Sequence, residues 1–246
     1  MATAQRHRMY ATGQGDNGSA AAARAIELDA NLAEAHAAKA GVLAAAGDYG
    51  AADEELAVAM RLDPDSVDVM QEAARLHFML KRYESAAASW DRYATLVETD
   101  IASGGLLITC YTALGDRANV ERVAQRTMAR AEKAVATDAD NGSAMATIFS
   151  CLLCLGETER AKEWARRAVL IDPDNLGMRY NLACDFVVAV HDHDMALEML
   201  RPVCRNSGHE QIAWIAADPD MDPLRDDPRF KELVAEAEAR LATARP

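Results

Sequence analysis

The sequence has few aromatic residues and fewer basic than acidic ones. Phe, Trp and Tyr together make up 5% of the 246 residues although 50% are apolar, so the core must be built mainly from small side chains. There are 26 Lys and Arg against 39 Asp and Glu, which gives a formal net charge of −13 at pH 7. Nucleic acids and anionic membrane surfaces are bound through clustered Lys and Arg, so neither is expected as a partner.

Long apolar runs and a leader pattern are also missing. No apolar run reaches the roughly 20 residues that a membrane-spanning helix needs. The N-terminus lacks the charged-then-apolar order of a signal peptide, which favours a cytoplasmic protein. An odd number of cysteines within helical patterns indicates reduced, packed thiols. They are Cys110, Cys151, Cys154, Cys184 and Cys204.

Signatures of catalysis and metal binding are weak or absent. The chain has no G-x-S-x-G, H-E-x-x-H or P-loop motif and no strand-like runs, so no enzyme activity and no cofactor are expected. Asp218, Asp220 and Asp222 have the spacing of a calcium loop, but the positions that require Gly and a bidentate carboxylate hold Pro223 and Arg229.

Two other groups of candidate metal ligands are better explained by structure. Residues 191–194, His-Asp-His-Asp, form a turn whose neighbouring side chains rarely converge on one ion, so a solvated turn is expected. Cys151 and Cys154 lack the second pair of ligands that a zinc site needs, and we expect them to pack. The sequence therefore predicts no metal site.

A unit of two short helices recurs through most of the chain. In residues 33–64 a first helix, about 33–46, is interrupted at Gly47, and a second runs to Leu62 before Pro64 stops it. The small or apolar residue before the inner turn returns at separations of 34, 34, 41 and 34 residues, which predicts a helix-turn-helix solenoid. These residues are Ala40, Ala74, Ile108, Phe149 and Ala183.

This pattern resembles the tetratricopeptide repeat family over about residues 20–205. The first unit matches at Ala40, Leu43, Gly47, Tyr49, Ala52, Leu56, Ala59 and Pro64. The second matches at Ala74, Leu80, Tyr83, Ala86, Trp90 and Leu96, and the fourth at Phe149, Leu152, Gly156, Ala161, Ala165, Ala168 and Pro173. The chain departs from the family where Lys81 replaces the inner-turn glycine and where the third unit carries seven extra residues.

The resemblance implies an all-α, right-handed superhelical solenoid of helix-turn-helix repeats. About five repeats span residues 20–205, with the third extended by seven residues. Residues 1–19 are expected to be flexible or frayed, and residues 206–246 to form a cap with a last helix at about 228–242. Pro202 is expected in the first turn of a helix. The residues expected to cover the terminal apolar face are Trp214, Leu224, Phe230 and Leu233.

The tail at residues 222–230, D-P-L-R-D-D-P-R-F, carries a second resemblance. It is similar to the ends of tetratricopeptide regions in bacterial multidomain signalling proteins such as nucleotide cyclases. That resemblance implies an alternative function, in which the chain is the regulatory portion of an adenylate or guanylate cyclase-like enzyme whose catalytic domain lies outside it.

The main functional prediction is a groove lined by the first helix of each unit, which binds a peptide or helix of a partner protein. Only Arg75 and Asn181 could clamp a carboxylate, so an apolar or helical ligand is expected. The N-terminal segment or a second copy of the chain could instead fill the groove, and a homo-oligomer stays open. The candidate groove residues are Ala37, Gly41, Asp68, Gln71, Arg75, Gly105, Thr109, Ala146, Ser150, Tyr180 and Cys184. The predicted role is a non-catalytic protein-interaction scaffold.

Overall fold

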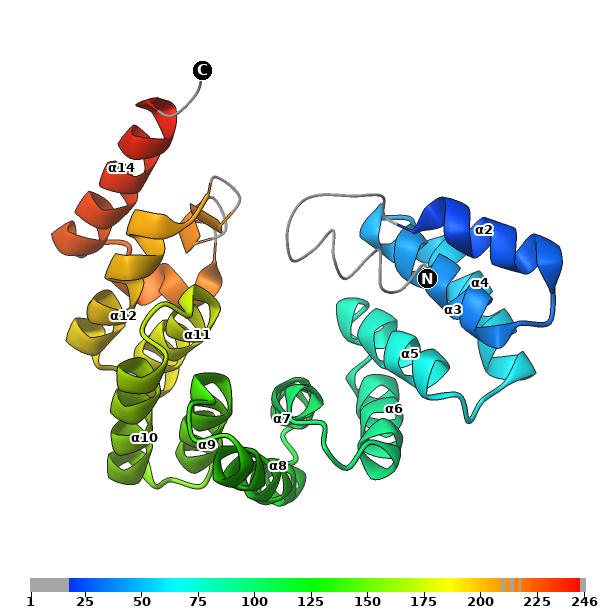
Figure 1. Cartoon of the computed structure of the whole chain (residues 1–246), viewed down its shortest axis with the longest axis horizontal. Helices are drawn as coiled ribbons and strands as arrows, with labels where there is room; N and C mark the ends of the chain where they lie inside the picture. The colour runs from blue at the N-terminus through cyan, green and yellow to red at the C-terminus, as the bar shows by residue number, and fades with distance from the viewer. Residues whose placement is uncertain (1–17, 209–210, 213–214, 217, 244–246) are drawn as a thin grey trace. The chain divides into compact units, whose positions relative to one another are not determined.

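The computed structural model describes residues 18–208, 211–212, 215–216 and 218–243 (Figure 1). Every regular element in these residues is a helix, which confirms the predicted all-α helical-repeat fold. Residue contacts divide the chain into two compact units, Met1–Val120 and Glu121–Pro246. The predicted boundaries at residues 19 and 205 do not coincide with this division and stay predictions. None of the described helices combines the length and the apolar character needed to cross a bilayer.

The first unit is built from consecutive helix pairs. Helix α3 packs against α4, and α5 against α6, while α3 also contacts α5 of the next pair. The first described helix, α2, packs on α3 through Ala22 and Ala38, as expected for the second helix of a preceding repeat. The bounds are α2 (Ser19–Leu28), α3 (Ala33–Ala45), α4 (Tyr49–Leu62), α5 (Val67–Met79), α6 (Tyr83–Leu96) and α7 (Ala102–Ala113).

The second unit continues the pairing and ends in a cap. Helix α9 packs against α10, α11 against α12, and the last helix, α14, against α12. The bounds are α8 (Arg117–Thr137), α9 (Gly142–Cys154), α10 (Thr158–Ile171), α11 (Leu176–Asp185), the π-helix η1 (Phe186–Val190), α12 (His193–Asn206), the 3₁₀-helix η2 (Pro219–Leu224) and α14 (Pro228–Thr243). Helix α8 begins just before the boundary between the units.

The seven extra residues of the third repeat lengthen its second helix. Helix α8 has 21 residues, whereas α4, α6, α10 and α12 have 14 each. Seven residues are about two helical turns, so the added length leaves the apolar stripe on the same face. The buried residues of α8 follow one face of the helix: Val123 and Thr127 are four apart, and Ala124, Thr127, Ala131 and Val135 are three or four apart.

The inner turns share one backbone conformation. Gly47, Gly115 and Gly156 have φ between 68° and 84°, and Lys81 and His191 reach 57° without being glycine. In the second repeat the amide of Arg82, after Lys81, donates to the carbonyl of His77, as that of Asp48 does to Leu43 in the first. Lys81 therefore occupies the predicted glycine position and bears the strain that a side chain adds there.

The fifth repeat carries one extra residue before its inner turn. Phe149 precedes Gly156 by seven residues, but the equivalent Ala183 precedes His191 by eight. The added residue is absorbed by the π-helix η1, whose wider turn accommodates one residue more than an α-turn. The Asp192 amide accordingly donates to Phe186, six residues back, where the other inner turns reach back five.

The last helix and three of the four residues expected to cover the terminal apolar face lie where the sequence predicts them. Leu224, Phe230 and Leu233 are buried, and α14 begins at Pro228, whereas Trp214 lies outside the described residues. Pro202 was expected in a first turn but lies well inside α12. Four residues follow it in that helix, and Asn206 Nδ2 donates to the Pro202 carbonyl at 3.0 Å. The exposed edge of α12 lets water reach the carbonyl that the proline leaves without a donor.

Candidate functional site

The two candidate residues of α3 belong to the core. Ala37 is 1% exposed and packs with Ala33, Ala59 and Val69, and Gly41 is also buried. Helix α3 is buried on several sides because α2, α4 and α5 all contact it. The predicted groove register does not account for the contacts that Ala37 makes with Ala59 of α4 and Val69 of α5. This first repeat therefore offers a ligand neither of the predicted side chains.

Helix α5 presents Asp68 to solvent and leaves Gln71 and Arg75 half-buried. Arg75 Nη1 lies 3.4 Å from Glu72 Oε1, and Glu72 is only 6% exposed. An isolated carboxylate is costly to bury, so the Arg75 guanidinium stabilises the folded chain by staying beside Glu72. Arg75 is consequently engaged within the protein, which is consistent with the expectation that the groove does not clamp a carboxylate.

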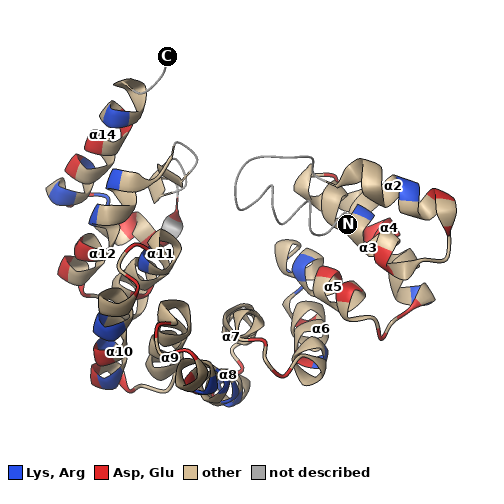
Figure 2. Ribbon diagram, viewed as in Figure 1, with Lys and Arg blue, Asp and Glu red and all other residues tan. Residues whose placement is uncertain are grey.

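Helix α7 carries the most open candidate residues. Gly105 and Thr109 are exposed, and Thr109 Oγ1 donates to the Gly105 carbonyl at 3.0 Å. A Cβ atom added at Gly105 would meet no atom within 4 Å, so the space above this residue is free. Neither α7 nor α9 contains a charged residue, and both appear entirely tan in Figure 2. The exposed face of α7 is therefore small and uncharged.

In the second unit, Ser150 is tied to a neighbouring helix. Ala146 is nearly covered, and Ser150 Oγ donates to Asp185 Oδ2 at 2.5 Å. Burial raises the pKa of Asp185, the Ser150 hydrogen bond lowers it, and the negative charge of Asp220 raises it further. Ser150 thus orients a partly desolvated carboxyl group of α11.

Tyr180 and Cys184 are covered by the chain's own C-terminal segment. The Tyr180 hydroxyl donates to Asp218 Oδ2, and Asp220 accepts a hydrogen bond from the Cys184 thiol. Burial raises the pKa of Cys184 to about 12, and it raises that of Tyr180 as well. The sequence predicts a partner's peptide or helix in the groove, with the N-terminal segment or a second copy of the chain as alternative occupants. In the fifth repeat residues 218–220 lie on these two positions.

The thiols have the character that the sequence predicts. All five are free, and three are buried while Cys154 and Cys184 are half-buried. Burial raises the pKa of Cys151 to about 12 and those of Cys110 and Cys204 to about 11. A thiol that stays protonated at neutral pH is a poor nucleophile, so none of these residues is prepared for covalent catalysis.

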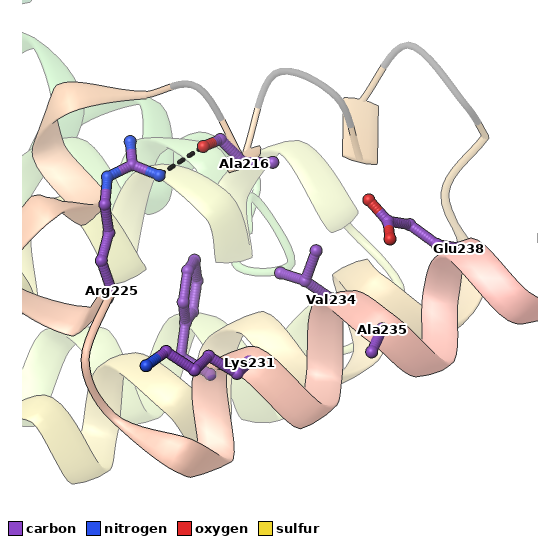
Figure 3. Close-up of a pocket in the computed structure, with 7 residues that line it drawn as sticks. Ala216, Arg225, Lys231, Val234, Ala235 and Glu238 are labelled. Carbon is purple, nitrogen blue, oxygen red and sulfur yellow. Dashed lines mark hydrogen bonds between the residues drawn. The ribbon is translucent and has the colours of Figure 1, made fainter.

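A pocket of about 320 Å³ lies on the cap, where the sequence gave no signal for one. Phe230 and Val234 supply an apolar floor, and Figure 3 shows Arg225, Lys231 and Glu238 around it. Arg225 is engaged within the cap, because it donates to the carbonyls of Ala216 and Asp218 and to Asp222. The lining residues are Ala216, Arg225, Phe230, Lys231, Val234, Ala235 and Glu238.

The turn at residues 191–194 lines a polar pocket of about 390 Å³ together with Lys162 and Val190. Its two aspartates have structural partners. Asp192 caps α12 by accepting from the Met195 amide at 3.1 Å, and Asp194 pairs with Arg229 at 2.7 Å. Within the described part of the chain, the only set of three ligand atoms close enough for one ion comes from Cys184, Asp218 and Asp220.

Residues 13–18 read GQGDNG, the glycine spacing of a dinucleotide-binding loop. That motif functions between a strand and a helix of a βαβ unit. Helix α2 begins at Ser19, directly after it, but the described residues contain no strand. The spacing alone carries no cofactor site.

Comparison with known proteins identifies the fold. No protein-family model matches the chain, and no curated protein matches it. Among solved structures, Pseudomonas aeruginosa pilF is 16% identical over 96% of each chain, with a TM-score of 0.57. YrrB, a TPR protein with an unusual peptide-binding site, is 17% identical over 89% of this chain and 98% of its own, with a TM-score of 0.50. A structure of a human IFIT1 dimer with PPP-AAAA is 11% identical over 98% of this chain and 63% of its own, with a TM-score of 0.58. The chain therefore has the tetratricopeptide-repeat fold.

Proposed function

We propose that the protein is a non-catalytic interaction scaffold that binds an apolar peptide or helix of a partner protein. The observation that carries this proposal is the exposed face of α7, where Ala102, Gly105 and Thr109 are small and uncharged. Charged residues make up 26% of the chain, so a helix without any is a local exception. A partner can cover such a face without desolvating a charge.

The space at Gly105 supports close approach of a ligand. The free volume beyond its Cα would let a partner's backbone or a large apolar side chain lie directly on α7. Thr109 leaves no unsatisfied donor when it is covered, because its hydroxyl already donates to the Gly105 carbonyl. In the second unit, α9 is likewise free of charge, but Ala146 is nearly covered and Ser150 donates to Asp185, so the proposed binding face is that of α7 alone.

The fold and the charge of the chain are consistent with a protein partner. YrrB has a peptide-binding site on a fold of this class, which supports a similar use here. The net charge of −13 disfavours nucleic acid and anionic lipid. The thiols are protonated by burial, and Arg75 is held by Glu72, which weighs against a nucleophile or an anion clamp among the candidate residues. We therefore assign no catalytic role.

The proposal can be tested with a library of random 15-residue peptides displayed on phage, selected against the immobilised chain. Selected peptides are synthesised and their affinity is measured by fluorescence polarisation. Thr109→Glu places a charge on the exposed face of α7 and should weaken binding at least tenfold. Thr95→Glu is the matched control, because Thr95 is also exposed and its hydroxyl also donates to a backbone carbonyl, that of Arg92. Equal affinities for the two variants, or selected peptides rich in acidic residues, would refute the proposal.

A further inference from the structure

Cys184, Asp218 and Asp220 bring three possible metal ligands together from distant parts of the sequence. The Cys184 Sγ atom and one carboxylate oxygen from each aspartate all lie within 4.8 Å of one another. Cys184 lies near the end of α11, and the two aspartates flank Pro219 at the start of η2. The sequence shows no motif here because Cys184 and Asp218 are 34 residues apart.

The two aspartates of the cluster have no Lys or Arg partner among the described residues, whereas the neighbouring aspartates do. In the same cap, Asp222 pairs with Arg225, Asp226 with Lys231, and Asp227 with Arg229. Among the described residues, no Lys or Arg pairs with the carboxylates of the cluster, Asp218 and Asp220, or with nearby Asp185. Arg225 comes close but donates to the backbone carbonyl of Asp218 at 3.1 Å rather than to its carboxylate.

The cluster is also partly withdrawn from water. Asp218 is 9% exposed, and Cys184 is half-buried. Asp218 is therefore a buried carboxylate without a Lys or Arg partner among the described residues, and such groups are normally paired or bound to a metal ion. This electrostatic deficit is a separate observation from the positions of the ligand atoms, and it too indicates a cation.

We propose that Cys184, Asp218 and Asp220 bind a divalent transition-metal ion, most suitably Zn²⁺, which joins the C-terminal cap to the fifth repeat. Zn²⁺ accepts thiolate and carboxylate ligands in one tetrahedral site, at about 2.3 Å and about 2.0–2.2 Å. Ca²⁺ and Mg²⁺ require oxygen ligands and do not use a thiolate, so the cysteine selects against them. On binding, the Cys184 thiol proton passes to solvent and a water completes the fourth position.

Tyr180 has a supporting role in this arrangement. Its hydroxyl donates to Asp218 Oδ2 and leaves the other oxygen, Oδ1, to accept from the Asp220 amide at 2.9 Å. These two bonds fix the orientation of one ligand carboxylate, as outer hydrogen bonds do in metal sites. The ion would hold Cys184 of α11 against residues 218–220 at the start of η2. The proposal concerns the cap and does not depend on peptide binding by α7.

Titration of the full chain with cobalt(II) tests the proposal directly. The protein is first stripped of metal with EDTA, and the EDTA is then removed. We expect one equivalent to bind, with tetrahedral visible bands and a near-ultraviolet sulfur-to-cobalt charge-transfer band that Zn²⁺ displaces. Cys184→Ser should abolish the charge-transfer band and weaken Co²⁺ binding at least tenfold. Asp220→Asn should weaken binding while the band remains at saturating Co²⁺. Cys154→Ser is the control, because this half-buried thiol is outside the cluster, and it should keep both the band and the affinity.

Two results would overturn the proposal. One is the absence of a sulfur-to-cobalt band from the full chain at about 1 mM Co²⁺, a concentration well above the dissociation constant expected of a protein metal site. The other is binding that Cys184→Ser leaves unchanged. If Cys184→Ser fails to fold, which circular dichroism in EDTA would reveal, Asp220→Asn decides, since Asp220 is exposed and its replacement is compatible with folding. A full affinity for Co²⁺ in Asp220→Asn would then reject the site.

Discussion

The Tyr180 hydroxyl donates a hydrogen bond to Asp218 Oδ2, 38 residues further along the chain. Tyr180 is on α11, at a position that the repeat register assigns to ligand binding, whereas Asp218 begins the cap. The same segment buries Met221 and Leu224 completely. The C-terminal cap therefore covers Tyr180, a predicted groove residue of the fifth repeat.

Replacing Tyr180 by Phe removes this hydrogen bond and leaves the Asp218 carboxylate with one donor fewer at 9% exposure. Hydrogen bonds to charged groups contribute about 1.5–3 kcal/mol, so we expect the free energy of unfolding to fall by about 2 kcal/mol. Urea denaturation followed by circular dichroism measures the change. Tyr49→Phe is the control, because Tyr49 is 40% exposed, and it should leave stability unaltered. Similar losses in both variants would show that the Tyr180 contact is not stabilising.

Lys81→Gly should stabilise the protein. Lys81 has φ of 57° at a position where Gly47, Gly115 and Gly156 serve in other repeats. A side chain in this left-handed region costs about 1–2 kcal/mol, and glycine costs about 0.5–1 kcal/mol in chain entropy, so the glycine variant should gain about 0.5–1 kcal/mol. The reciprocal change, Gly47→Lys, should lose about 1 kcal/mol. The urea midpoint should rise for Lys81→Gly and fall for Gly47→Lys. Shifts of the same sign would contradict the proposed backbone strain at Lys81.

Ala74→Glu should prevent the first unit from folding. Ala74 is 0% exposed and lies on α5, so the substitution buries a carboxylate without a partner and overfills the core. The expected loss exceeds about 4 kcal/mol. Thermal unfolding monitored by circular dichroism would show a lost or broadened transition. Ala88→Glu, on the exposed face of α6, is the control and should melt like the parent chain.

Arg75→Glu should also destabilise the protein, although the position looked like a free groove residue in the sequence. The substitution removes the guanidinium beside Glu72 and places a second carboxylate there, at a cost of about 1–3 kcal/mol. Glu72→Gln in the same chain should restore part of the loss, because the two sites are coupled. Urea denaturation of the single and double variants measures this coupling. Additive losses would mean that Arg75 does not act through Glu72.

Asp185→Asn is expected to stabilise the metal-free protein at pH 7. Burial raises the pKa of Asp185 above its value in an unfolded chain, so the folded state favours the protonated form. The stability linked to this group is complete below the unfolded-state pKa and is lost as the pH rises through the folded-state pKa. Asparagine remains neutral and can still accept from Ser150.

The advantage of Asp185→Asn over the parent should accordingly shrink as the pH falls from 7 toward about 4. Urea denaturation in EDTA at several pH values provides the measurement. Asp174→Asn, in the exposed turn before α11, serves as the control and should track the parent throughout. An Asp185→Asn variant that is less stable at pH 7, and increasingly so in acid, would reverse the sign of this argument.

The helices could be predicted from the sequence because their signals are local. The stride of 34 residues and the Gly and Pro stops locate α3, α4, α9 and α10, and seven extra residues translate into two added turns of α8. The partner of Arg75 could also have been predicted from the sequence, because Glu72 lies three residues before it on the same face of the helix. The contact with Glu72 keeps the Arg75 guanidinium engaged within the protein.

Contacts between distant segments could not be obtained in this way. Nothing near Tyr180 or Cys184 in the sequence indicates that residues 218–220 will reach them, because the approach depends on the path of the cap. The burial of Ala37 likewise depends on its contacts with Ala59 of α4 and Val69 of α5. The partner and the cyclase-like alternative stay predictions, because they concern molecules or domains that the structure does not contain. The groove as a binding site also stays a prediction.

The single residue added before His191 separates the fifth repeat from its predecessors. A repeat that kept the seven-residue spacing would turn Phe186 and Val187, both fully buried, by about 100° about the helix axis and away from their present neighbours. Copies of the earlier repeats could thus be duplicated to lengthen the array, whereas the fifth cannot be exchanged for any of them. If such a protein lengthened by duplication of repeats, the new units would have to be inserted before α11, and the fifth repeat would keep its present sequence next to the cap.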